Sequence, residues 1–173
     1  LGVNFYTNAR IGHQIEGSTQ MKQRIVSTLV GASIESTPVG PLTDMGWPIT
    51  PQGIGDLLVR WTREYPAELP QLFISENGCA YDDGPGADGR VRDDRRIDYL
   101  SRHIASVERA IERGANVGGY YEWSLLDNYE WALGYEKRFG MVHVDYQTQV
   151  RTPKDSAHWY AGVIRRNGLP KAD

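Results

Sequence analysis

A carboxylate follows a short apolar run near the middle of the chain. Residues 71–78 read Gln-Leu-Phe-Ile-Ser-Glu-Asn-Gly. The apolar part predicts a buried strand at residues 71–75, and Glu76 comes where that strand stops. In parallel α/β folds, active sites lie at the carboxyl ends of the strands. Because an unpaired carboxylate costs desolvation free energy at such a place, Glu76 is the first candidate catalytic residue.

A second group of candidates is rich in tryptophan and tyrosine. The chain has 5 Trp and 10 Tyr but only 3 Phe. Residues 119–131 hold many of them and read Gly-Tyr-Tyr-Glu-Trp-Ser-Leu-Leu-Asp-Asn-Tyr-Glu-Trp. Aromatic side chains with a polar group suit surfaces that are partly apolar and partly hydrogen-bonding, such as sugar-binding clefts. Ordinary packing is the alternative for any one of them.

The elements that must position these residues alternate between strand and helix. The predicted strands are residues 1–6, 71–75 and 117–124, and the predicted helices are residues 54–61, 93–113 and 153–166. This alternation predicts a parallel sheet. The long loops all follow strands, which favours a (β/α) barrel over an open sheet.

The longest predicted helix carries one apolar stripe and a clear stop. Its apolar stripe consists of Ile97, Leu100, Ile104, Val107 and Ile111. Gly114 follows at the usual C-terminal position. Residues 19–34 carry a weaker apolar pattern, which fits either a short helix or a strand.

Composition excludes several classes of partner. The 173 residues are 40% hydrophobic and 24% charged, as in a soluble globular protein, and the net charge of −3 argues against nucleic acid or anionic membranes as partners. The apolar stretches are too short to span a bilayer, and we find no signal-peptide pattern. Cys79 is the only cysteine, which excludes internal disulfides and fits a cytoplasmic location.

No motif indicates a metal or an organic cofactor. None of the strands is followed by a glycine-rich phosphate-binding pattern. Asp82, Asp83 and Asp88 lie together in one glycine-containing loop. Their spacing differs from that of an EF-hand, so we expect a solvated turn rather than a calcium site.

Several motifs in order resemble one enzyme family. They are residues 2–6 (Gly-Val-Asn-Phe-Tyr), 74–78, 119–131, 134–140 (Gly-Tyr-Glu-Lys-Arg-Phe-Gly), 144–146 and 152–156. Together they resemble the C-terminal part of the family 1 glycoside hydrolases, the β-glucosidase family. The resemblance covers essentially the whole chain.

The resemblance implies a (β/α)₈ TIM barrel that hydrolyses β-linked sugars with retention. Two carboxylates about 5 Å apart perform this reaction, one as nucleophile and one as acid and base. Glu76 matches the family nucleophile, with Ser75 in place of a threonine. Tyr6 matches the tyrosine whose hydroxyl bonds that carboxylate, which favours its ionised form. Asn4 matches a polar residue beside the same subsite.

The family's other sugar contacts also have matches here. Trp123 resembles the platform beneath the glucose ring, and Glu130 with Trp131 resembles the pair that binds hydroxyls at the far side of the ring. Phe139 matches an aromatic near the exocyclic carbon, and Trp47 one that lines the aglycone side. Packing is the alternative for Trp131 and Phe139, and a solvated loop charge is the alternative for Glu130.

Neighbouring polar residues are expected to have structural roles. Lys137 and Arg138 are expected only to tie down their loop through salt bridges, and His143 to be structural in a β-rich segment. Glu122 stands where the family usually has a small or apolar residue. If Trp123 points into the cleft, strand alternation sends Glu122 toward the helices, where it needs a partner that the sequence does not reveal.

The family's acid/base glutamate belongs to an Asn-Glu-Pro motif that these residues lack. The chain also opens within a strand and supplies about three of eight barrel strands. We therefore expect residues 1–173 to be the C-terminal portion of a single (β/α)₈ catalytic domain, incomplete on its own. A complementary N-terminal part is expected to carry the acid/base, and this chain alone is expected to lack normal activity.

Glu130 also bears on the substrate. Because a carboxylate would repel a sugar phosphate, we expect unphosphorylated glucose, galactose or fucose units, released from β-glucosides or short oligosaccharides. A non-catalytic carbohydrate-binding or interaction module and a transglycosylase stay open as alternatives. A strand-end Glu76 aligned with Tyr6 argues against a pure binding module.

Overall fold

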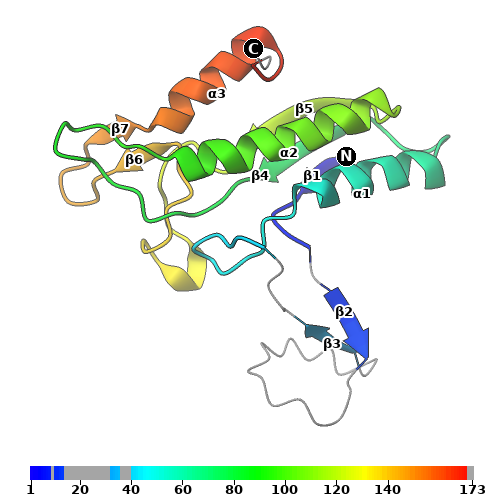
Figure 1. Ribbon diagram of the computed structural model, residues 1–173, viewed down its shortest axis with the longest axis horizontal. Helices are drawn as coiled ribbons and strands as arrows, with labels where there is room; N and C mark the ends of the chain where they lie inside the picture. Colours follow the sequence, from blue (N-terminus) through cyan, green and yellow to red (C-terminus); the bar gives the residue numbers. More distant parts are fainter. Residues whose placement is uncertain (9, 14–31, 36–39, 171–173) are drawn as a thin grey trace.

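A computed structural model of the protein describes residues 1–8, 10–13, 32–35 and 40–170 (Figure 1). Its strands are β1 (Gly2–Asn4), β2 (Arg10–His13), β3 (Ala32–Glu35), β4 (Leu72–Asn77), β5 (Val117–Glu122), β6 (Val142–Val144) and β7 (Arg151–Pro153). Its helices are α1 (Pro51–Glu64), α2 (Asp94–Glu112) and α3 (Asp155–Arg166), with a 3₁₀ turn η1 at Trp131–Leu133. Within this described part, no helix is long and apolar enough to cross a membrane.

The central feature is a parallel sheet with the strand order β1-β4-β5. The antiparallel pairs β2–β3 and β6–β7 are separate from it. Helices α1 and α2 lie side by side along the sheet (Figure 1). This arrangement of strands and helices is consistent with part of an α/β barrel, as predicted.

One face of the sheet builds the core with the helices. Leu72 and Ile74 of β4 are fully buried against Ile54 and Leu58 of α1 and Val107 of α2. The other face is open among the described residues. Its residues include Ser75 and Tyr121, and Tyr121 is 59% exposed.

An extra residue in β4 changes which face each side chain takes. Ile74 pairs with Tyr120, but Asn77 pairs with Glu122, so β4 advances three residues while β5 advances two. A bulge of this kind redirects side chains and is common beside active sites. Strict alternation from Ile74 would place Glu76 on the helix face. The bulge instead gives that face to Asn77 and turns Glu76 to the open face.

Helix α2 begins and ends close to the predicted residues 93–113, whereas α1 extends beyond the predicted residues 54–61 at both ends. Pro51 occupies the first turn of α1, where its missing N–H costs nothing. Gly114 follows α2 with φ of +97°, a conformation that glycine adopts without strain. The prediction for residues 19–34 lies outside the described residues except at its end, which belongs to β3.

The predicted apolar stripe of α2 is partly wrong. Ile111 is 48% exposed, whereas Arg96 and His103 are fully buried. The helix is therefore rotated from the orientation that apolar spacing alone predicts. The reason is that Arg96 has buried ion-pair partners, so its burial does not leave an unpaired charge.

Several predicted strand and helix boundaries also need correction. β1 is shorter than the predicted residues 1–6, and β4 ends at Asn77 rather than at residue 75, so Glu76 lies within the strand. The third strand ends at Glu122 rather than Ser124, because Ser124 N–H donates to the Phe139 carbonyl and leaves the sheet. The peptide bond between Trp123 and Ser124 is cis. The last helix begins at Asp155 rather than Pro153, since Pro153 pairs with Val142 in the β6–β7 ladder.

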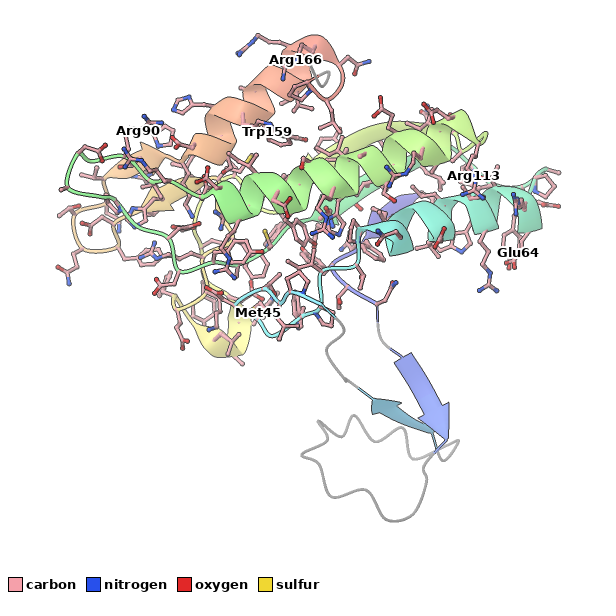
Figure 2. The ribbon with its side chains drawn as sticks, in the orientation of Figure 1. Met45, Glu64, Arg90, Arg113, Trp159 and Arg166 are labelled. Carbon is pink, nitrogen blue, oxygen red and sulfur yellow. The ribbon has the colours of Figure 1, made fainter. Side chains whose placement is uncertain are left out.

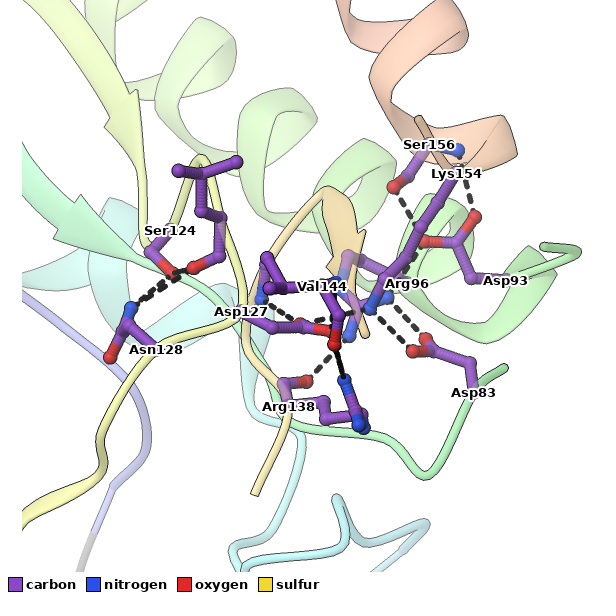
Figure 3. A network of polar contacts seen from close by, with 12 residues as sticks. Asp83, Asp93, Arg96, Ser124, Asp127, Asn128, Arg138, Val144, Lys154 and Ser156 are labelled. Carbon is purple, nitrogen blue, oxygen red and sulfur yellow. Dashed lines mark hydrogen bonds and ion pairs between the residues drawn. The ribbon is translucent and has the colours of Figure 1, made fainter. Parts of the chain in front are cut away.

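The loop of residues 82–90 is exposed as expected except at Asp83, whose side chain is buried in ion pairs. Figure 3 shows Asp83 and Asp93 directed at Arg96, while Lys154 contacts Asp83 and Asp127. The Lys154 Nζ atom lies 2.5 Å from Asp83 and 3.2 Å from Asp127. We call these five residues the ion-pair cluster. It ties the loop after β4 to the start of α2 and to the segment before α3.

Other residues in this region behave as predicted. Arg138 forms a salt bridge of 2.7 Å with Asp127, and Lys137 one of 2.9 Å with Glu136. His143 lies in β6, in the β-rich segment expected for it. Among the described residues, no group of three or more acidic, His or Cys side chains is arranged to hold a metal ion.

Candidate active site

Glu76 and Tyr6 meet at the C-terminal edge of the sheet. The Phe5 N–H donates to the Glu76 carbonyl at 2.9 Å, which fixes β1 beside β4. Tyr6 follows directly, and its hydroxyl donates to Glu76 Oε2 at 2.7 Å. Burial and the Glu76 carboxylate raise the pKa of Tyr6 far above its usual value. Tyr6 therefore stays a hydrogen-bond donor to this carboxylate across the neutral range.

Asn4 lies on the same face of the sheet as Glu76. It is exposed and pairs with Glu76 in the β1–β4 ladder. The Ser75 hydroxyl donates to Asn4 Oδ1 at 2.9 Å. The Ser75 hydroxyl therefore holds the Asn4 side chain in place.

Tyr6, Trp47 and Phe139 form an aromatic group beside the carboxylate. Ring centroids lie 5.6 Å apart for Tyr6 and Trp47, and 6.2 Å apart for Tyr6 and Phe139. The loop of Met45, which continues into Trp47, lies beside the segment that carries η1 (Figure 2). Phe139 is only 2% exposed, so it supports the Tyr6 ring by edge-on packing. Its contact with a sugar stays a prediction.

Trp123 is the first residue after β5. Its N–H donates to the Asn77 carbonyl at 3.0 Å, so it lies beside the residue that follows Glu76. Glu122, the residue directly before it, takes the helix face of the sheet. Alternation therefore places Trp123 on the face that Glu76 occupies.

Glu130 and Trp131 come from the loop between β5 and β6. Partial burial and the negative charge of Glu76 raise the pKa of Glu130. Trp131 opens η1 and is 82% exposed. The structure thus joins Tyr6 to Glu76, keeps Glu130 within range of the Glu76 charge and leaves Trp131 facing solvent.

The sequence reasoning missed a buried polar group behind Glu76. Asn77 is fully buried, and its side chain bonds to the Phe5 carbonyl and to the hydroxyls of Tyr99 and Tyr120. We call Asn77, Tyr99 and Tyr120 the amide cluster. The available signal was an amide directly after a candidate nucleophile, but only the register of the sheet reveals its direction.

Glu122 faces the helix layer, as its position predicted. Both of its carboxyl oxygens are buried and accept no hydrogen bond from the described residues. Burial raises the pKa of Glu122 well above its usual value, although the positive charges of Arg96 and Lys154 oppose that shift. Burial therefore favours the neutral form of this carboxyl more than in an exposed glutamate.

Comparison with known proteins places these features in one family. A family model for Glycosyl hydrolase family 1 matches residues 1–169. Beta-glucosidase A from Thermotoga maritima is 53% identical over 129 residues, covering 75% of this chain and 28% of the relative. A 1,4-beta-D-glucan glucohydrolase from Thermotoga neapolitana is 44% identical, covering 98% of this chain and 35% of the relative. A 6-phospho-beta-galactosidase from Streptococcus equi subsp. zooepidemicus is 40% identical, covering 92% of this chain and 35% of the relative.

Solved structures agree with this assignment. A family 1 β-glucosidase from Thermotoga maritima superposes with a TM-score of 0.85 at 43% identity, covering 98% of this chain and 35% of that one. The same TM-score and identity hold for the Thermotoga maritima enzyme in complex with deoxynojirimycin. The chain thus spans about a third of the length of the proteins that it matches. It belongs to glycosyl hydrolase family 1.

Proposed function

We propose that the complete protein containing this chain hydrolyses β-glycosidic bonds with retention of configuration and that Glu76 is its nucleophile. The observation that carries the proposal is the hydrogen bond of 2.7 Å from Tyr6 to Glu76 at the C-terminal edge of the sheet. Family membership supports it, since the relatives include proteins named as β-glucosidases and 6-phospho-β-galactosidases.

In the first chemical step, a Glu76 oxygen attacks the anomeric carbon. Tyr6 holds Oε2, while Oε1 accepts no side-chain hydrogen bond from the described residues, so we assign the attack to Oε1. The glycosidic bond breaks as the ester bond forms, and an acid protonates the departing oxygen. In the second step that group removes a proton from water, which attacks the same carbon and releases Glu76 as a carboxylate.

The acid and base belongs, in this proposal, to a complementary N-terminal part of one (β/α)₈ barrel. Residues 1–173 would then form the C-terminal portion of that catalytic domain. Two observations support this division. The chain spans about a third of the length of its relatives, and the sheet face that carries Ser75 and Tyr121 is open among the described residues.

The proposed substrate is an unphosphorylated β-glucoside or a short oligosaccharide with a glucose, galactose or fucose unit. Glu130 carries the argument, because it lies close enough to Glu76 for the two charges to interact. A sugar with a phosphate at this end would bring two further negative charges toward Glu130. Trp123 would stack beneath the sugar ring, with Trp131 and Asn4 contacting its hydroxyls.

A trapping experiment tests the nucleophile. The complete protein is incubated with a 2-fluoro β-glucoside, and the labelled peptide is identified by mass spectrometry. We expect the label on Glu76 and none in a Glu76→Gln variant that keeps the parent's melting temperature. Label on another carboxylate, or active protein that never becomes labelled, would contradict the assignment.

A pair of substrates tests the sugar. Turnover of aryl β-glucoside should exceed turnover of its 6-phosphate in the parent. Glu130→Gln should narrow this ratio by removing the negative charge that the phosphate meets. A parent that prefers the phosphorylated substrate would refute the substrate assignment while leaving the role of Glu76 intact.

A further inference from the structure

We propose that the buried side-chain amide of Asn77 is a positioning residue that sets the contact between Tyr6 and Glu76. The inference rests on the proposed function and goes beyond it, because Asn77 faces away from the sugar site. Asn77 is fully buried on the helix face, while its neighbour Glu76 is half-buried on the open face. It would therefore act only through the two residues that it holds.

The orientation of this amide is fixed by its partners. Asn77 Nδ2 donates to the Phe5 carbonyl at 2.6 Å, and a carbonyl can only accept, so the nitrogen must face it. The same nitrogen donates to the Tyr99 hydroxyl at 3.2 Å. On the other side, the Tyr120 hydroxyl donates to Asn77 Oδ1. Both amide N–H groups and the amide oxygen are thus in use.

These bonds hold the backbone of Tyr6 from both sides. The Phe5 carbonyl belongs to the peptide group before Tyr6. The Tyr99 hydroxyl donates to the carbonyl of Tyr6 itself at 3.1 Å. One amide therefore controls the two peptide groups that flank Tyr6, the first directly and the second through Tyr99. With both fixed, the Tyr6 hydroxyl has a defined path to Glu76.

Together these contacts form a closed loop of covalent bonds and hydrogen bonds. Glu76 is joined covalently to Asn77, Asn77 to the backbone at Tyr6 by hydrogen bonds, and Tyr6 back to Glu76 through its hydroxyl. The Asn77 carbonyl also accepts a hydrogen bond from the Trp123 N–H, so the position of Asn77 also fixes the backbone at the end of β5. A shift of Asn77 would thus move the nucleophile, its hydrogen-bond donor and Trp123 relative to one another.

Only a neutral amide satisfies all of these partners. An aspartate would turn an oxygen toward the Phe5 carbonyl and could not donate to it. A leucine would leave that carbonyl buried without its side-chain donor. Because displacements near 1 Å at a reacting group can lower rates about 10²-fold, loss of this amide should reduce kcat much more than it changes KM.

The test uses the complete protein and conservative Tyr→Phe substitutions, because Asn77 variants risk misfolding. Tyr99→Phe removes the hydroxyl that links Asn77 to the Tyr6 carbonyl. Tyr160→Phe is the matched control, since it removes a part-buried hydroxyl that also donates to a backbone carbonyl, that of Tyr120, at 2.8 Å. We expect Tyr99→Phe to lower kcat about tenfold with little change in KM, and Tyr160→Phe to leave kcat near the parent value.

A double-mutant cycle separates positioning from general stability. Tyr6→Phe removes the hydroxyl that Tyr99 is proposed to aim, so Tyr99→Phe should have little further effect on kcat in that background. Equal kcat for Tyr99→Phe and parent, or independent effects of the two substitutions, would overturn the proposal. Labelling of Glu76 in the parent is scored separately, so failure of the nucleophile assignment is distinguishable from failure of this inference.

Discussion

The amide cluster and the ion-pair cluster are two buried polar groups that share one helix. Tyr99 and Arg96 lie three residues apart on α2 and contribute to one cluster each. The amide cluster contains only neutral groups and lies directly behind the proposed nucleophile. The ion-pair cluster contains Arg96, Lys154 and three aspartates and joins segments up to 71 residues apart.

The difference reflects two tasks. Neutral hydrogen bonds fix the direction of groups without adding a charge behind Glu76, which in the proposed mechanism reacts as a carboxylate. Buried ion pairs attract more strongly but cost desolvation free energy, so breaking one leaves an unpaired charge in the interior. We therefore expect substitutions around the amide cluster to change catalysis and substitutions in the ion-pair cluster to change stability.

The largest expected effect is on catalysis. Glu76→Gln keeps the size of the side chain and one oxygen that can accept from Tyr6, but it removes the attacking carboxylate. We expect kcat on an aryl β-glucoside to fall by at least about 10³-fold. Thermal unfolding should change little. A variant with more than a tenth of parental activity would contradict the proposed role. The amide cluster would then no longer lie behind a catalytic group, unlike what the comparison of the two clusters assumes.

The next effect should be on stability alone. Lys154→Met removes the cation between Asp83 and Asp127 and leaves their buried charges less compensated. We expect a loss of about 3–5 kcal/mol in the free energy of unfolding, measured with urea, and an unchanged kcat per folded molecule. Arg102→Met is the control, since its pair with Asp98 is exposed and should cost less than about 1 kcal/mol.

His103 connects the amide cluster to pH. Its ring stacks on Tyr99 with centroids 3.9 Å apart, and burial lowers the pKa of His103 to about 4. As the pH falls, the His103 imidazole of the unfolded chain binds a proton near pH 6.5, whereas that of the folded chain binds it only near pH 4. Stability should therefore fall between these values as the pH falls, by about 3 kcal/mol for this group.

His103→Asn tests this assignment. Asparagine keeps a donor for the Tyr99 carbonyl, which His103 Nδ1 contacts at 2.7 Å, but it does not titrate. The variant should lose less stability than the parent between pH 6.5 and pH 4. Parallel stability curves for the two proteins over this range would show that His103 does not contribute.

The smallest effect is expected at Glu122, between the two clusters. Burial raises its pKa in the folded state, so the folded protein holds a proton that the unfolded chain releases above its ordinary pKa. Stability from this group is therefore lost as the pH rises. Glu122→Gln should stabilise the protein by about 1–3 kcal/mol at pH 7 and by little at pH 4. A destabilised variant at pH 7 would indicate that the carboxylate is ionised and paired in the complete protein.

Several elements could be predicted because their signals are local. Gly114 marks the end of α2, because glycine adopts a positive φ without strain. The apolar run of residues 72–74 predicts β4 in the same way. The motifs around Glu76, Tyr6 and Trp123 resemble those of the family, and the family comparison agrees with them.

The burial of charged residues could not be predicted in this way. Asp83 reads as a loop charge, and Arg96 interrupts an apolar stripe. Each is buried because its partner comes from elsewhere, as when Lys154 reaches Asp83 across 71 residues. Charge pairing at this distance along the chain leaves no periodic pattern in the sequence.

The sequence by itself determined the identity of the candidate nucleophile, its place at a strand end and the family to which the chain belongs. Only the tertiary structure decided which way the carboxylate points. The bulge between Ile74 and Asn77 turns Glu76 toward the open face and Asn77 toward the helices, and it depends on the register of β4 against both neighbouring strands. Register is a property of paired strands, so a single strand's sequence does not contain it.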